Sequence, residues 1–141
     1  MPAIKRLLET ALYVHDLDRS QKFYESVLRL SPLFDGSDPA ADSRFRPMGL
    51  PGDCVLLLFK QGATTDTAVL PGGTIPGHGA SGPIHIAFAV DSLDGWREHL
   101  AAHGVALEGE TRWPRGGTSW YFRDPDGHLL EVATPGIWPI Y

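Results

Sequence analysis

The sequence predicts an α+β fold made of two βαβββ modules. Residues 7–14 and 83–90 both alternate apolar side chains with small or polar ones, as half-buried strands do. A helical spacing of apolar residues follows each of these strands, and further strand-like runs come after each helix. Shifting the sequence by 76 residues places ETALYVHDLD (9–18) over HIAFAVDSLD (85–94). The two halves are therefore interpreted as repeats of one unit that share a core.

In the first module, about residues 5–62, the strand at 7–14 directs Leu12 and Val14 to one face and Ala11 and Tyr13 to the other. Asp16 or Asp18 is expected to cap the helix that follows, whose apolar positions are Phe23, Val27 and Leu30 and which Pro32 closes. Strands are expected around Leu33 and Phe45, and a stronger one over CVLLLFK (54–60).

Glycines and prolines crowd residues 61–83, so this segment is predicted to be a long loop without helix or strand. The second module, about residues 83–134, begins with the strand PIHIAFAV. Residues 91–105 follow as a helix that stops at Gly104. Its last strands, TSWYFR and HLLEVA, are joined by the turn DPDG, and an apolar tail occupies residues 135–141.

Composition narrows the classes of partner. The chain has 141 residues, a net charge of -5 and no cluster of Lys and Arg, so neither nucleic acid nor an anionic membrane is an expected partner. The longest apolar run, CVLLLF, is far shorter than the roughly 20 residues that a membrane-spanning helix needs. A cytoplasmic location is therefore expected, and the single cysteine, Cys54, is expected to pack in the core.

Three side chains that can bind metal lie on the less apolar faces of predicted strands. They are Glu9, His85 and Glu131, and the first two align in the repeat. Burying two carboxylates without a cation is very costly, whereas a divalent ion between them offsets their charge. On strand periodicity alone an alternative stays open, in which both glutamates face solvent and His85 is a hydrogen-bonded strand histidine.

The order of these pieces resembles the vicinal oxygen chelate superfamily, which includes glyoxalase I, fosfomycin-resistance enzymes, extradiol dioxygenases and bleomycin-binding proteins. The resemblance is carried by LYVHDLDRSQKFYESVLRL, HIAFAV and YFRDPDGHLLEV and spans nearly the whole chain. It implies curved mixed sheets around a metal-binding cavity, with ligands at the positions of Glu9, Leu57, His85 and Glu131. Because Leu57 cannot bind metal, three protein ligands and open positions for water or substrate are expected around a Zn, Ni, Mn or Fe ion.

Other residues are expected around this centre. Strand alternation in the hairpin places Tyr121 on the same face as Glu131. A catalytic role is therefore expected for Tyr121 together with Glu9 and Glu131, although a tyrosine at this place equally suits the cavity wall. A wall that binds substrate is expected from Tyr13, Leu57 and Phe59 together with Arg115, which could pair with an anionic group. His78, in the long loop, is expected to be exposed rather than to act as an acid or base.

The resemblance implies a divalent-metal-dependent enzyme whose small substrate chelates the ion through adjacent oxygens. A glyoxalase-like isomerase or lyase is favoured over an extradiol-type dioxygenase, because no additional acid–base histidine is evident. The third alternative is a metal-free, antibiotic-binding protein similar to bleomycin-resistance proteins. Fosfomycin modification is disfavoured. The resemblance implies that a phosphonate-binding arginine would follow the last ligand strand, and the segment ATPGIWPIY at that place carries no cation. In this family two modules close around a site within a chain or across a dimer, so a homodimer is expected.

Overall fold

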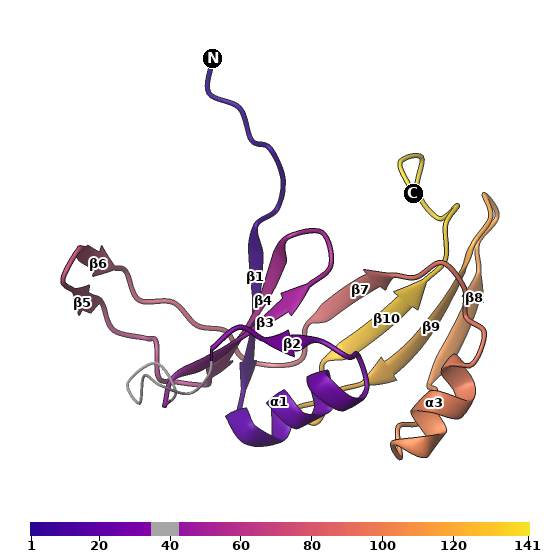
Figure 1. Cartoon of the computed structure of the whole chain (residues 1–141), viewed down its shortest axis with the longest axis horizontal. Coiled ribbons are helices and arrows are strands. Elements are labelled where there is room, and N and C mark those ends of the chain that lie inside the picture. The colour runs from indigo at the N-terminus through magenta and orange to yellow at the C-terminus, as the bar shows by residue number, and fades with distance from the viewer. Residues whose placement is uncertain (35–42) are drawn as a thin grey trace. The chain divides into compact units, whose positions relative to one another are not determined.

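The computed structural model describes residues 1–34 and 43–141, which divide into two compact units, Met1–Ser81 and Gly82–Tyr141. Among the described residues each unit contains a four-stranded mixed sheet and an α-helix, so the predicted α+β class is confirmed (Figure 1). Residues 35–42, which fall within the predicted first module, lie outside the described part. No helix in the described part is both long and apolar enough to cross a bilayer.

The sheet of the first unit has the strand order β1-β4-β3-β2. Its strands are β1 (Glu9–Val14), β2 (Ser31–Pro32), β3 (Phe45–Leu50) and β4 (Cys54–Lys60). β1 runs parallel to β4, and the other neighbours are antiparallel. The helix α1 (Leu17–Ser26) connects β1 to β2 and packs against β3 and β4.

Alternation along the strands separates two faces of this sheet. The core side chains are buried and include Leu12, Val14, Tyr24, Met48, Leu56 and Leu58. Side chains at the intervening positions, such as Leu57 and Phe59, are half-buried on the opposite face. α1 begins as expected, because the Asp16 carboxylate accepts a hydrogen bond from the Arg19 backbone N–H at 2.9 Å. It ends at Ser26, well before the expected stop at Pro32.

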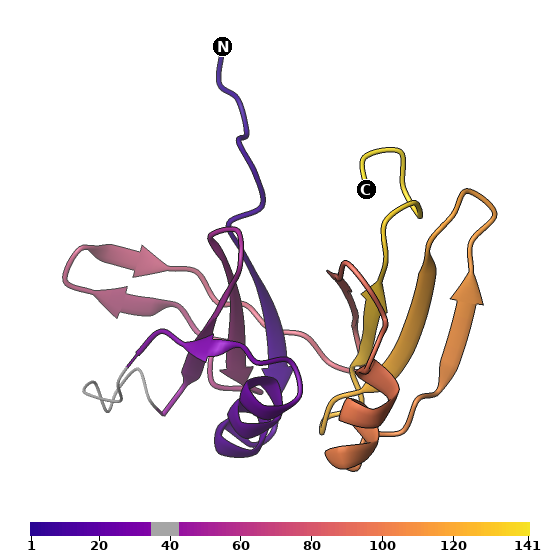
Figure 2. The ribbon, with the colours of Figure 1, turned by 45° about the vertical axis from the view of Figure 1, so that its right-hand side comes forward.

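The second unit repeats the same architecture, with the strand order β7-β10-β9-β8 (Figure 2). Its strands are β7 (His85–Ala89), β8 (Gly109–Arg112), β9 (Thr118–Arg123) and β10 (Leu129–Ala133). β7 runs parallel to β10, and the remaining pairs are antiparallel, as in the first unit. Ala11 lies opposite Leu57 and Ala87 lies opposite Glu131, so Leu57 and Glu131 occupy equivalent positions in the two sheets.

Two further predicted elements differ from the structure. The helix expected over residues 91–105 is only α3 (Trp96–Ala102), because Gly95 adopts a φ of 75° that does not continue a helix toward the N-terminus. The loop expected to lack regular structure contains a hairpin of β5 (Ala68–Leu70) and β6 (Gly73–Ile75). Pro71 and Gly72 form the two-residue turn of that hairpin, so these breakers reverse the chain between two short strands.

The DPDG turn is stabilised by Asp124, whose carboxylate accepts hydrogen bonds from the backbone N–H groups of Asp126 and His128. His128, at the end of this turn, is buried, with only 3% of its surface exposed. Its Nδ1 accepts a hydrogen bond from the Ile84 N–H at 3.0 Å. The imidazole therefore fixes the start of β7 beside β10.

Replacing His128 with alanine is expected to lower the free energy of unfolding by about 1–3 kcal/mol, because a partly buried N–H loses its acceptor. Chemical denaturation of both proteins measures this difference. His103→Ala, an exposed change on the same unit, is the control and is expected to alter stability by less than about 0.5 kcal/mol. Equal losses in the two variants would contradict this role of His128.

The C-terminal tail folds back on its own unit. The Tyr141 hydroxyl lies 3.0 Å from the backbone oxygens of both Val90 and Ala133. Trp138 and Ile140 remain largely exposed.

Candidate active site

His85 and Glu131 meet on one face of the sheet of the second unit. β7 and β10 are adjacent parallel strands, and Leu129 lies opposite His85 in their register. The side chain of Glu131, two residues further along β10, reaches back so that its Oε2 lies 3.0 Å from His85 Nε2. The carboxylate is only 7% exposed, whereas the imidazole is 48% exposed. Two metal-capable groups therefore converge at a point that is open on the histidine side.

The orientation of the His85 ring follows from its second nitrogen. Nδ1 lies 3.2 Å from the backbone oxygen of Leu129, which can only accept a hydrogen bond, so Nδ1 is placed to donate one. Nε2 is then the nitrogen turned toward Glu131. Histidines that bind metals commonly donate their other ring N–H to a carbonyl, which fixes the ring. An imidazole nitrogen and a buried carboxylate oxygen directed to the same point fit a divalent ion.

Tyr121 belongs to the same group. β9 places it directly opposite Glu131, and its ring centroid lies 6.4 Å from that of His85. On the other side of Glu131, β7 presents Ala87, whose methyl group occupies little space. The predicted proximity of Tyr121 and Glu131 is therefore observed.

The first unit carries a different pair at the equivalent positions. Glu9 corresponds to His85 and Leu57 to Glu131, because Ala11 and Ala87 align in the repeat. Glu9 is exposed, and its neighbour Leu57 is an apolar residue where the second unit has Glu131. Within residues 1–34 and 43–141, no group of three or more His, Cys, Asp or Glu side chains is arranged to hold a metal. Participation of Glu9 as a third ligand stays a prediction.

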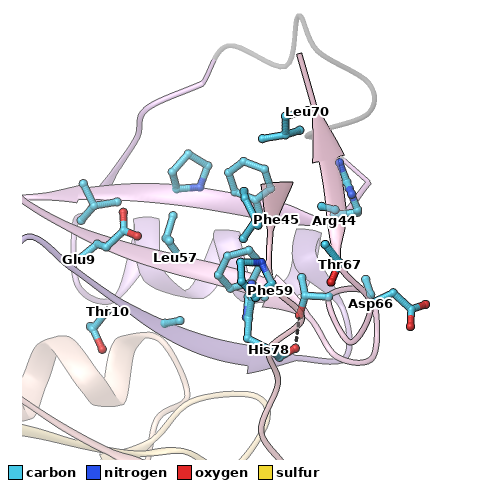
Figure 3. A pocket seen from close by; sticks show the side chains of 18 of the residues that line it. Glu9, Thr10, Arg44, Phe45, Leu57, Phe59, Asp66, Thr67, Leu70 and His78 are labelled. Atoms are coloured by element: carbon cyan, nitrogen blue, oxygen red, sulfur yellow. Dashed lines mark hydrogen bonds between the residues drawn. The ribbon is translucent and has the colours of Figure 1, made fainter. Parts of the chain in front are cut away.

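A pocket of about 1090 Å³ opens on the same face of the first unit as Leu57 and Phe59 (Figure 3). Thirteen of its twenty lining residues are apolar, which favours a largely apolar ligand. Glu9 also lines this pocket. Tyr13 stacks on Phe59, with their ring centroids 5.8 Å apart. Of the three residues expected in one cavity wall, Leu57 and Phe59 line this pocket, whereas Tyr13 contacts Phe59 without being one of the lining residues.

His78 occupies a different place from the exposed position expected for it. It is half-buried and lines the pocket, with its Nδ1 2.5 Å from the Tyr13 hydroxyl. Its backbone is held on both sides by Thr64, through a 2.8 Å bond from its N–H and a 2.9 Å bond to its carbonyl. Gly77 allows this close packing, because a Cβ there would lie 2.1 Å from the Thr65 carbonyl oxygen. The glycine before His78 was the available signal in the sequence.

Arg115 is not brought to this group. It lies in the exposed turn between β8 and β9, beyond the end of the sheet where Ser119 pairs with Ala133. Glu131 pairs with Tyr121, further along the same strands. A role for Arg115 in binding substrate stays a prediction.

Comparison with known proteins gives similarities along nearly the whole chain. Residues 6–132 match the family model of the Glyoxalase/Bleomycin resistance protein/Dioxygenase superfamily. A "Probable lactoylglutathione lyase" of Vibrio parahaemolyticus is 30% identical over 129 residues, which cover 90% of this chain and 88% of the relative. The "Metallothiol transferase FosB" of Shouchella clausii is 30% identical over 128 residues, covering 86% and 74%. The solved structure of lactoylglutathione lyase from Agrobacterium tumefaciens, 30% identical, covers 98% of this chain and 99% of its own, with a TM-score of 0.83.

Proposed function

Because the chain belongs to the Glyoxalase/Bleomycin resistance protein/Dioxygenase superfamily, we propose that it is a divalent-metal-dependent enzyme of the vicinal oxygen chelate type. Its substrate is a small molecule that presents two adjacent oxygens to the metal. The pairing of His85 Nε2 with Glu131 Oε2 at 3.0 Å carries this proposal. The names of the relatives, a lyase of lactoylglutathione and a metallothiol transferase, support enzymatic activity.

In this proposal His85 and Glu131 hold the ion, and Glu9 is the third protein ligand. We also propose that the protein is a homodimer. Apolar side chains exposed on the described surface support such an assembly, including Val69, Ile75, Trp138 and Ile140. The Zn, Ni, Mn and Fe ions are all compatible with a set of one imidazole and two carboxylates.

A glyoxalase-like isomerisation or lysis suits these residues better than oxygen chemistry. The chemistry that a bound divalent ion supplies is Lewis-acid polarisation of oxygen. Glu9 is the candidate base, because it is exposed at the pocket wall, whereas Glu131 is buried beside His85. The Glu9 carboxylate takes a proton from the carbon that bears the substrate hydroxyl and returns it to the neighbouring carbonyl carbon, while the hydroxyl proton passes to the former carbonyl oxygen. The Tyr121 hydroxyl donates a hydrogen bond to a substrate oxygen.

The Glu9→Gln variant separates proton transfer from metal binding. We expect its kcat to fall by about 100- to 10,000-fold, the usual contribution of a general base, while the metal affinity falls less than in a variant that lacks His85. The assay measures isomerase or lyase turnover with each candidate ion, and methylglyoxal with glutathione, the reactants of lactoylglutathione formation, serves as the first substrate pair. Glu98→Gln, an exposed change on α3, is the matched control and should keep the wild-type rate. Ring opening of a catechol with oxygen consumption, in place of the lyase reaction, would favour a dioxygenase.

A further inference from the structure

The pocket of the first unit has a continuous aromatic wall. The ring of Phe45 lies 5.7 Å from Phe34 and 5.7 Å from Phe59, and Phe59 lies 4.8 Å from the His78 imidazole in an edge-on arrangement. Aromatic rings prefer such offset or edge-on neighbours, and a planar ligand inserted among them gains the same contacts. A wall of this kind favours a flat, unsaturated ligand over a flexible aliphatic one.

Charge is confined to the two ends of this pocket. Figure 3 shows Glu9 and Thr10 at one end and Arg44, Asp66 and Thr67 at the other, with apolar side chains between them. Arg44 is half-buried, and among the described residues no carboxylate lies within ion-pair distance of its guanidinium. Asp66 is exposed at the rim. A ligand carboxylate is therefore the natural partner for Arg44, because guanidinium binds carboxylate with two parallel hydrogen bonds.

The aromatic wall is built before any ligand enters. The segment that carries His78 is held by its two backbone hydrogen bonds to Thr64 and by the contact of Gly77 with Thr65. Tyr13 holds the imidazole ring itself through its hydroxyl. Because these side chains need little further ordering, binding loses less conformational entropy than it would in a mobile loop.

We propose that this pocket binds the planar aromatic body of the substrate, with a terminal carboxylate of the substrate paired to Arg44. The end of the substrate that reacts then lies toward Glu9. The substrate class is thus an aryl carboxylate that carries two adjacent oxygens at the end remote from its carboxylate. Assigning the reacting end rests on the proposed function, whereas the aromatic and carboxylate subsites do not.

Isothermal titration of the metal-free, full-length protein with 2-naphthoate and with neutral 2-naphthamide tests the two subsites separately. Arg44→Gln is expected to weaken naphthoate binding about 10- to 150-fold, through loss of a hydrogen bond to a charged group, and naphthamide binding less than about twofold. Phe59→Leu is expected to weaken both ligands about 3- to 10-fold, because both lose an aromatic contact. Lys22→Gln removes an exposed charge from α1 and should change neither affinity.

Equal effects of Arg44→Gln on the two ligands, or no effect on either, would overturn the proposed carboxylate subsite. Glutathione, which lacks a ring, should bind the metal-free protein more weakly than naphthoate, and tighter binding of glutathione would overturn the aromatic subsite. Thermal unfolding of each variant verifies that it is folded. Metal affinity of the same variants should equal that of wild type. If the variants bind metal but do not show the expected changes in naphthoate and naphthamide affinity, this inference alone is contradicted. If those changes appear but the protein binds no metal, the proposed function alone is contradicted.

Discussion

Replacing His85 with alanine is expected to weaken binding of a divalent ion by about 100-fold or more, since even the loss of an outer partner of a metal ligand costs roughly 10- to 100-fold. In the proposed set His85 is the only imidazole. Its Nδ1 bond to the Leu129 carbonyl already directs Nε2 toward Glu131, so the ring is oriented before the ion arrives. Titration calorimetry with nickel and with zinc measures the affinity directly.

His103→Ala is the control for this experiment. His103 is also a histidine of the second unit, but it lies exposed at the end of α3, where its Nδ1 donates to the His99 carbonyl at 2.8 Å. Its removal should leave the metal affinity unchanged. An unchanged affinity in His85→Ala, with the protein folded, would exclude His85 from the ligand set.

Metal binding is also expected to stabilise the folded protein by about 4 kcal/mol when the free ion is present at about 1,000 times its dissociation constant. This stabilisation should disappear in Glu131→Leu. In the metal-free state, however, the same variant should be as stable as wild type or more stable by about 1–2 kcal/mol, because a buried carboxylate is replaced by an apolar side chain of similar size. His85 is half-exposed, so it is not left buried without a partner.

Glu131→Leu would then lower the free energy of unfolding with the ion present but leave it unchanged or raise it without the ion. This result would identify Glu131 as a residue retained for binding rather than for stability. Chemical denaturation with and without the ion measures both values. Loss of stability in the metal-free variant, with the response to metal intact, would instead mark Glu131 as a structural partner of His85. The control is Glu108→Leu, an exposed carboxylate of the same unit whose partner is Arg123.

Much of the fold was predictable because the sequence contains two copies of the same strand and helix pattern. The alternation in ETALYV and HIAFAV and the shared position of Ala11 and Ala87 predict two equivalent strands, and both sheets have the same order. Departures occur where one residue decides the local structure. Gly95 shortens α3 because its positive φ excludes the preceding residues from the helix. The β5–β6 hairpin was missed because Pro71 and Gly72 both break regular elements and form tight turns.

The centre of the candidate site was also predictable, whereas its surroundings were not. Strand parity places Tyr121 and Glu131 on one face, and their direct pairing follows from the DPDG turn between them. Strand alternation does not apply to a loop. Gly77 signals close packing, but the position of His78 against Tyr13 depends on hydrogen bonds between residues far apart in the sequence. The burial of His128 likewise depends on Ile84, which lies far away in the sequence.

The most direct test of the proposed metal centre is X-ray absorption spectroscopy of the protein loaded with zinc or nickel, together with elemental analysis. The proposal predicts about one ion per chain, with one imidazole and otherwise only oxygen ligands, because His85 is joined by Glu9, Glu131 and solvent or substrate. Two or more imidazoles, or a sulfur ligand from Cys54, would contradict this ligand set. A protein that takes up no divalent ion at all would contradict the metal-dependent enzyme and favour a ligand-binding protein.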